Sequence, residues 1–374
     1  MENIGKTTRA KNQSKIGGEK MNYLDTINKE IKEYFKILSP EFPEWLLEYI
    51  DTPEMQRISK ISMNCGTDYS KIFNIKYWYS NLDHSIGVAL IIWNFTHDKK
   101  QTLSGLFHDI ATPVFKHCID FMNGDTEHQE STEERTEQII RNSKEIMELL
   151  KRDKIKIEEI SDYHIYPIAD NDTPKLSADR FEYNFSSGLE FYRVWEIDTI
   201  KEIYDNICIL RNEEGIDELG FKDWKICEKY IHIISKLWPK WRTKEDKTVM
   251  QFLADIVKSM NVKGYITIND LYNLSEKEVI DRILNCEDKY IRENFKKFQN
   301  ATSVYESDVK IEDKYCINVI PKRRYIIPLT IFEGKTKRIN EVSEQARDDI
   351  NNYLNIKDCK YSGFDFEFEP YISL

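Results

Sequence analysis

The sequence contains few of the residues that build turn-rich or cross-linked folds. Among its 374 residues there are 13 Gly and 10 Pro, which argues against an all-β fold with many turns. The 7 cysteines are scattered singly and form no closely spaced pair, so neither a disulfide framework nor a zinc knuckle is predicted. This cysteine usage favours a reducing compartment, and we expect a cytoplasmic protein.

Long apolar runs and an excess of positive charge are also missing. The longest apolar run, residues 86–95, is much too short to cross a bilayer, and no signal peptide is predicted. The formal net charge of −11 argues against nucleic acid as the main partner. A metal ion can nevertheless hold phosphate groups inside an acidic protein, so a nucleotide substrate stays open.

The residues that are present indicate a soluble, mainly α chain with a different C-terminal part. Hydrophobic residues make up 40% and charged residues 32% of the chain, enough for a large core. Residues 1–20 have almost no apolar side chains and are predicted to be a disordered leader, with Met21 as a candidate natural start. Residues 21–300 are predicted to form a helical domain, and residues 301–374 a small α+β region.

Apolar residues at helical spacing, with first-turn prolines after caps as at Thr52-Pro53, divide the helical part into segments. The predicted helices span residues 43–50, 53–62, 84–96, 101–109, 113–121, 132–151, 175–187, 222–238, 245–259, 268–284 and 287–299. Residues 206–221 instead have the pattern of a β-hairpin with its tip at residues 213–215. In the C-terminal region we expect strands within 303–333, a helix near 340–354 and a last aromatic strand.

Residues 103–109 (LSGLFHD) combine an apolar helical face with His108 and Asp109 at its end. Burying these two side chains together is costly without a partner, and a divalent cation would offset that cost. His84 begins the preceding apolar helix, and a short polar turn makes the two helices antiparallel. His84 lies about 18 Å and His108 about 12 Å from this turn at 1.5 Å per residue, so they can meet within about one helical turn.

A fourth candidate ligand, Asp179, lies far downstream in residues 176–183 (LSADRFEY). It shares a helical face with Leu176 and Tyr183, and a carboxylate on such an apolar and aromatic face favours a cation partner. The sequence therefore predicts one metal ion bound by His84, His108, Asp109 and Asp179.

The order of these residues and their surroundings resembles the HD-domain superfamily of metal-dependent phosphohydrolases. The greatest likeness is to its deoxynucleoside triphosphate triphosphohydrolase (dNTPase) branch, and it covers roughly residues 45–330. An HD dipeptide alone would be unspecific, but the combination of motifs is specific. The likeness is carried by residues 51–58 (DTPEMQRI), 83–88 (DHSIGV) and 108–117 (HDIATPVFKH), with weaker echoes at His128 with Glu130, at 179–183 and at 274–283.

This resemblance implies a mainly α HD-domain core with the C-terminal α+β region as an appendage. It implies a divalent transition metal, and mixed His and carboxylate ligation suits Mn, Fe, Ni, Co or Zn better than Mg alone, with Mg considered for the substrate phosphates. By position, His128 corresponds to a general acid for the leaving oxygen, His117 to a cleft histidine, and Glu130 is expected to orient His128. Candidate substrate-binding residues are Lys116, Lys175, Arg180 and Tyr183.

The chain also departs from the branch at catalytic and sugar-reading positions. An Arg, a His, a Gln and an Asp of the branch fall on Asn81, Thr112, Met63 and Ser187, and Gln129 follows His128 where the branch has Glu. The leading hypothesis is a metal-dependent phosphohydrolase acting on a nucleotide or another phosphorylated small molecule, most like a dNTPase. The alternatives are a nucleotidase or phosphodiesterase of the superfamily, and a metal-binding regulatory module with weakened catalysis.

Two further features concern partners. The basic trio Lys322-Arg323-Arg324 could bind an anionic effector or nucleic acid, but a solvated strand edge is the simpler interpretation. Members of the superfamily often form oligomers, so a homo-oligomer is one expectation. No membrane partner is expected.

Overall fold

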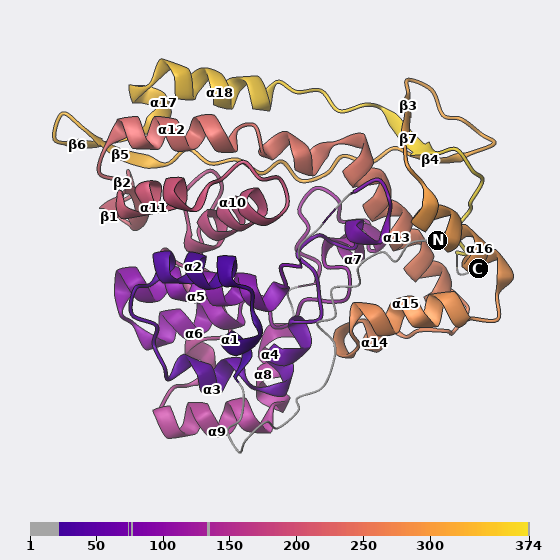
Figure 1. The fold of residues 1–374 in the computed structure, drawn as a ribbon, viewed down its shortest axis with the longest axis horizontal. Helices are drawn as coiled ribbons and strands as arrows, with labels where there is room; N and C mark the ends of the chain where they lie inside the picture. The colour runs from indigo at the N-terminus through magenta and orange to yellow at the C-terminus, as the bar shows by residue number, and fades with distance from the viewer. Residues whose placement is uncertain (1–21, 74, 76–77, 133–134, 373–374) are drawn as a thin grey trace.

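The computed structural model describes residues 22–372 except 74, 76–77 and 133–134. The predicted leader and the candidate start at residue 21 lie outside the described residues. Most of the described chain is helical, with small sheets that include C-terminal strands, so the predicted fold class is confirmed (Figure 1). Within the described ranges, none of the helices is both long and apolar enough for a membrane span.

The helices occur in the order expected from the sequence. They are α1 (Tyr23–Thr26), α2 (Lys29–Leu38), α3 (Leu46–Ile50), α4 (Pro53–Ile58), α5 (Asn81–Thr96), α6 (Lys99–Phe107), α7 (His117–Met122), α8 (Thr136–Asn142), α9 (Lys144–Asp153), α10 (Ala178–Glu190), α11 (Ile197–Asp205), α12 (Trp224–Ile234), α13 (Lys244–Val262), α14 (Ile268–Asn273), α15 (Glu276–Asn285), α16 (Lys289–Asn300), α17 (Ile339–Val342) and α18 (Glu344–Leu354).

Side-chain caps explain where several helix boundaries differ from the prediction. α5 begins at Asn81 instead of residue 84, because the Ser80 side chain accepts from the Asp83 amide and the Asp83 carboxylate accepts from the Ser80 amide. The predicted helix over 132–151 is divided where Ser143 caps α9. The predicted helix over 268–284 is divided in the same way, by the capping box of Ser275 at the start of α15.

The strands form two small sheets. The predicted hairpin is confirmed as β1 (Ile207–Arg211) and β2 (Asp217–Phe221), with Gly215 at a φ of 76° in its turn. Strand β2 also pairs in parallel with β5 (Leu329–Phe332), giving the order β1-β2-β5-β6 with β6 at Lys335–Arg338. The second sheet has the order β3-β7-β4, with strands Tyr305–Ser307, Tyr361–Phe364 and Tyr315–Ile317.

The C-terminal region packs into two hydrophobic clusters. The first cluster is built on α2, α5, α6, α10 and α12 and also contains Ile326, Ile350 and Tyr353. The second is built on α13 and α16 and contains Tyr315 and Phe364. Helix α18 runs beside α12, far from the second sheet (Figure 1). Residues after 300 therefore belong to both cores, and a domain boundary at residue 300 stays a prediction.

Candidate metal centre

Three helices carry the predicted metal ligands. Helices α5 and α6 are joined at His97, which ends α5 with a φ of 49°, and at Asp98, whose carboxylate accepts from the amides of Lys100 and Gln101. Close packing requires glycine: a Cβ at Gly105 of α6 would lie 2.2 Å from the Ile92 side chain of α5. This short connection and close packing bring His84 of α5 near the residues that follow α6.

Three of the predicted ligands form one group: the ligand atoms of His84, His108 and Asp109 all lie within 4.8 Å of one another. The Nε2 atom of His84 lies 3.2 Å from His108 Nε2, 3.0 Å from Asp179 Oδ1 and 4.0 Å from Asp109 Oδ2. His108 Nε2 lies 3.6 Å from Asp109 Oδ2 and 3.7 Å from Asp179 Oδ1. Atoms about 2.1 Å from a shared ion are separated by about 3.0 Å at right angles and about 4.2 Å on opposite sides. The separations within His84, His108 and Asp109 fit ligands of a single ion, and Asp179 lies beside the two histidines. That Asp179 is a fourth ligand stays a prediction.

Hydrogen bonds on the far side of each ring fix the chemistry of the two histidines. His84 Nδ1 donates to the Glu182 carboxylate, and His108 Nδ1 donates to the Gly105 carbonyl oxygen at 2.7 Å. In the neutral imidazoles both Nε2 lone pairs then face each other and the carboxylates of Asp109 and Asp179. These lone pairs and carboxylates repel one another unless a positive charge lies between them, so the arrangement fits a divalent cation.

The ionisation of the cluster reflects the same need for positive charge. Burial alone would lower the pKa of His84, but the carboxylates of Glu182 and Asp179 raise it to about 10. Burial opposes ionisation of Asp109, yet Lys116, His108 and His84 hold its pKa well below the usual range. His84 likewise lowers the pKa of Asp179 to about 2 despite burial. Without an ion the site takes up a proton in its place.

Glu182 orients His84 from behind and was not singled out from the sequence. Its side chain is 0% exposed and accepts from Tyr34 Oη at 3.2 Å, Tyr79 Oη at 2.6 Å and Ser186 Oγ at 3.1 Å. Gly87 of α5 makes room for it, since a Cβ there would lie 2.7 Å from Glu182 Cγ. Histidine ligands commonly donate to such a carboxylate. The available signal was a glutamate one turn after Asp179 on a largely buried helix.

Lys116 enters the site from a strained stretch of backbone. The predicted helix over 113–121 is wrong in its first turn, because Phe115 and Lys116 have φ values of 66° and 46° and α7 begins only at His117. The Lys116 ammonium lies 2.9 Å from Asp109 Oδ2 and also donates to Asn81 Oδ1. It also lies 3.2 Å from Met63 Sδ, so it contacts one predicted ligand and two of the residues where the chain departs from the dNTPase pattern.

A small cleft adjoins the cluster. Its volume of about 30 Å³ is enough for a water molecule. His117, in its wall, donates from Nδ1 to Asp120 Oδ2 at 2.9 Å. Burial and the nearby Arg324 guanidinium lower the pKa of His117, although Asp120 acts to raise it. The lowered pKa favours the neutral imidazole. The lining residues are His108, Asp109, Ala111, Thr112, Pro113, Lys116, His117, Gln129 and Thr132.

Neither His128 nor Glu130 lines this cleft. His128 is exposed, and its amide donates to Asp125 Oδ1 at 3.1 Å; Glu130 is exposed and pairs with Lys322 at 3.0 Å. Gln129, with a φ of 58°, is the residue whose side chain is buried there. The catalytic roles of His128 and Glu130 stay predictions, and no described contact of their side chains brings them to the metal cluster.

The other predicted substrate contacts are engaged elsewhere. Lys175 pairs with Glu214 of the hairpin turn at 2.8 Å. Arg180 donates to Asn171 and to the Lys175 carbonyl oxygen, so it holds the loop before α10. Tyr183 packs edge-on against Trp241, with ring centroids 5.5 Å apart. Their roles in substrate binding stay predictions.

Arg324 contacts two residues that line the cleft, and this contact was not predicted from the sequence. The interpretation of the basic trio as a strand edge is wrong, because residues 318–328 form no strand. Arg324 Nη2 donates to Gln129 Oε1 at 2.6 Å and to His117 Nε2 at 3.3 Å. No local sequence signal identifies this contact, since its partners lie far away along the chain.

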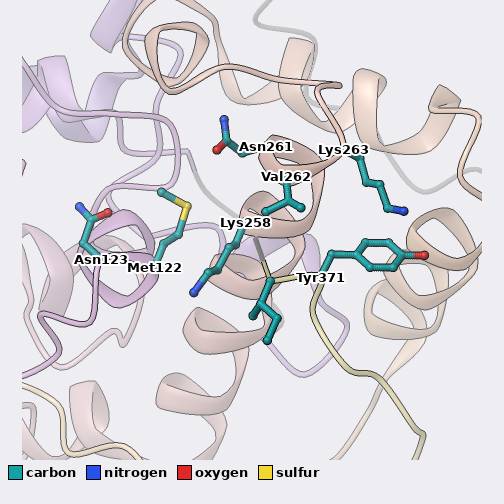
Figure 2. Close-up of a pocket in the computed structure, with 8 residues that line it drawn as sticks. Met122, Asn123, Lys258, Asn261, Val262, Lys263 and Tyr371 are labelled. Carbon is teal, nitrogen blue, oxygen red and sulfur yellow. The ribbon is translucent and has the colours of Figure 1, made fainter. Parts of the chain in front are cut away.

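A larger hollow of about 700 Å³ is lined by none of the cluster or cleft residues named above (Figure 2). It is lined by Met122 and Asn123, by the end of α13 and by Tyr371, whose ring centroid is 3.9 Å from Lys263 Nζ. Its lining, as far as the structure describes it, contains neither histidine nor carboxylate. It therefore offers no metal ligands of the predicted kind.

Comparison with known proteins shows which proteins this chain is similar to in sequence and in fold. No protein-family model matches the chain. The uncharacterized protein YdhJ of Bacillus subtilis (strain 168) is 23% identical over 307 residues, which cover 81% of this chain and 89% of that protein. A hypothetical protein from Aquifex aeolicus has a TM-score of 0.60 at 17% identity, over 86% of this chain and 92% of that one. A phosphohydrolase from Bacteroides thetaiotaomicron has a TM-score of 0.60 at 14% identity, over 86% and 96%. At these identities the two solved structures show a shared fold.

Proposed function

We propose that this chain is an HD-type metal-dependent phosphohydrolase whose ion is bound by His84, His108, Asp109 and Asp179. The observation that carries the proposal is the pair of Nε2 atoms 3.2 Å apart, both turned toward carboxylates by the hydrogen bonds on Nδ1. The similar fold of a protein named a phosphohydrolase supports the same reaction class. When bound, a divalent ion supplies Lewis-acid activation of a phosphate oxygen and of the attacking water.

The residues around the cleft supply the remaining functions in this proposal. We assign phosphate binding to Lys116, because its side chain is 6% exposed and its ammonium lies at the cluster. We assign proton transfer to His117 in place of His128, because His117 lines the cleft. Its lowered pKa favours the neutral imidazole, whose Nδ1–H donates a hydrogen bond to Asp120. The positive charge that binds phosphate and the group that transfers a proton then come from two adjacent residues, Lys116 and His117.

The substrate class is a further part of the proposal. We propose a nucleotide or another small phosphorylated compound, with dNTP hydrolysis as the first hypothesis and nucleotidase or phosphodiesterase activity as the next. The cleft of about 30 Å³ is far smaller than the several hundred Å³ of an ordinary ligand pocket. A phosphate group can enter only if wall side chains shift, and a nucleoside would lie outside the present cavity.

The small cleft also favours a second candidate, a metal-binding regulatory module without turnover. In that case the ion would stabilise the junction of α5, α6 and α10, and Lys116 would remain paired with Asp109 at 2.9 Å. The two candidates agree on the metal and differ only in hydrolysis.

One experiment on a single preparation separates them. Metal content is measured, and dNTPs, NTPs, monophosphates and cyclic nucleotides are then incubated with Mn, Mg, Fe, Co or Ni and analysed by product chromatography. We expect about one ion per chain and metal-dependent hydrolysis, both lost in His84→Ala. The control His232→Ala removes an exposed histidine that pairs with Asp349 on α18 and should change neither. A bound ion without hydrolysis of any compound favours the regulatory module, and no ion at all contradicts both candidates.

A further inference from the structure

Arg324 is a partly buried cation without an anionic partner. Its guanidinium donates to the Gln129 amide oxygen at 2.6 Å and to His117 Nε2 at 3.3 Å. No carboxylate among the described residues lies within ion-pair distance of it. Two other arginines differ: Arg242 pairs with Asp358, and Arg338 pairs with Glu213 and Glu218. In the part of the chain that the structure describes, Arg57 and Arg323 also lack a carboxylate partner, but they donate to main-chain carbonyl oxygens away from the Arg324 contacts. A guanidinium removed from water without a counter-charge is costly unless an anion joins it.

One carboxylate, Asp246, interacts electrostatically with Arg324 but does not form an ion pair with it. Asp246, in the first turn of α13, is close enough for Arg324 to favour its ionised form. Burial is the larger effect and raises the pKa of Asp246 to about 7. Near neutral pH Asp246 is only partly ionised, so it offsets only part of the charge of Arg324. Lys116, which pairs with Asp109, is the second cation at the cleft.

The main chain holds Arg324 firmly at this position. On one side the Lys322 amide donates to the Thr126 carbonyl oxygen at 3.0 Å, and on the other the Ile327 amide donates to the Pro174 carbonyl oxygen at 2.7 Å. Ile326, between them, is fully buried in the first hydrophobic cluster. The guanidinium is thus presented by a fixed segment, directly behind the two cleft residues that accept its hydrogen bonds.

We propose that Arg324 binds the phosphate group of the substrate and, with Lys116, forms the anion subsite of the cleft. This inference rests on the proposed function and names the residue that recognises its substrate class. When phosphate binds, the guanidinium exchanges Gln129 Oε1 and His117 Nε2 for phosphate oxygens, for which its fork of donors is suited. The exchange releases the lone pair of His117 Nε2, which is then free to take a proton at the reacting group.

The test compares two neighbouring arginines with an inorganic probe. Arg324→Ala removes the proposed subsite, whereas Arg323→Ala removes a side chain that donates to the carbonyl oxygens of Leu354 and Ile356. Pyrophosphate is titrated calorimetrically into wild type and variants of equal measured metal content. We expect Arg324→Ala to raise the Kd for pyrophosphate about 10-fold to 100-fold. Arg323→Ala should leave it within about twofold.

Further readouts keep the result unambiguous. Arg324→Gln is the second variant, in case the alanine variant does not fold, and circular dichroism confirms its fold. Binding by a folded Arg324 variant equal to that of wild type overturns the inference, and so does failure of wild type to bind pyrophosphate. Binding that depends on Arg324 in a protein that hydrolyses nothing supports the subsite and rejects the proposed enzyme.

Discussion

The two walls of the cleft are built in different ways. The helix wall is the side of His108 and Asp109, which follow α6 and line the cleft. We include in it His84 of α5 and Asp179 of α10, which contact His108 but do not line the cleft. The loop wall consists of Lys116, His117 and Gln129, which line the cleft, and of Arg324, which donates to His117 and Gln129. Lys116 and Gln129 have positive φ, and Arg324 lies 195 positions after Gln129. Packed helices with hydrogen bonds behind each ligand suit a site that must hold fixed geometry. A wall joined by contacts between distant loops suits a site whose partners exchange when a substrate enters.

The largest effect expected from this difference is a separation of metal binding from substrate binding. Asp179→Ala removes a helix-wall ligand that lies 3.0 Å from His84 Nε2, and we expect loss of the bound ion and of all hydrolysis. Gln129→Ala removes a buried loop-wall side chain and should leave about one ion per chain. Metal analysis by mass spectrometry after dialysis measures both. Equal loss of metal in the two variants would mean that the walls are not separate.

A smaller effect is expected one layer behind the helix wall. Glu182→Gln keeps the shape of the side chain but removes the carboxylate that accepts the proton of His84 Nδ1. We expect metal affinity to fall about 10-fold to 100-fold, measured by competition with a chelator. Tyr34→Phe is the matched control, because it removes only a 3.2 Å hydrogen bond to the same carboxylate. Unchanged affinity in Glu182→Gln would show that the orientation of His84 comes from packing alone.

The contrast between the walls also explains what the sequence could predict. The four candidate ligands follow from an apolar helical pattern, a short turn and ionisable residues on buried faces, and all of them lie within 4.0 Å of His84 Nε2. Whether they bind an ion stays a prediction. The mainly α fold and the hairpin followed from periodicity and were confirmed.

The parts that could not be predicted depend on tertiary contacts. Arg324 reaches the cleft because β5 joins the hairpin and Ile326 enters the helical core, and nothing near residue 324 in the sequence encodes either event. The side chain of Gln129, and not that of His128, lines the cleft. Gln129 has a φ of 58°, a local backbone conformation that the sequence pattern does not predict. The breaks at Ser143 and Ser275 were different, since cap residues were present but the helical period continued across them.

The smallest expected effect concerns stability and compares two glutamates of α10. Glu182, beside the helix wall, has a full set of donors, whereas neither carboxylate oxygen of Glu190 has a hydrogen-bond partner in the described structure, although its side chain is 2% exposed. Burial is the main cause that raises the pKa of Glu190 to about 7, and Glu30 adds to it.

Because an unfolded glutamate has a pKa of about 4.3, the folded chain binds more protons between the two values. The contribution of Glu190 to the free energy of unfolding is therefore fully present below about pH 4 and is lost as the pH rises through 7. We expect Glu190→Gln to recover about 1–2 kcal/mol of unfolding free energy at pH 8 relative to pH 5, measured by urea unfolding, with metal content unchanged. Glu196→Gln, at an exposed position, controls for the loss of a carboxyl group. An identical pH dependence in Glu190→Gln and wild type would show that this carboxyl group finds a partner in solution. Glu190 would then be as well hydrogen-bonded as Glu182.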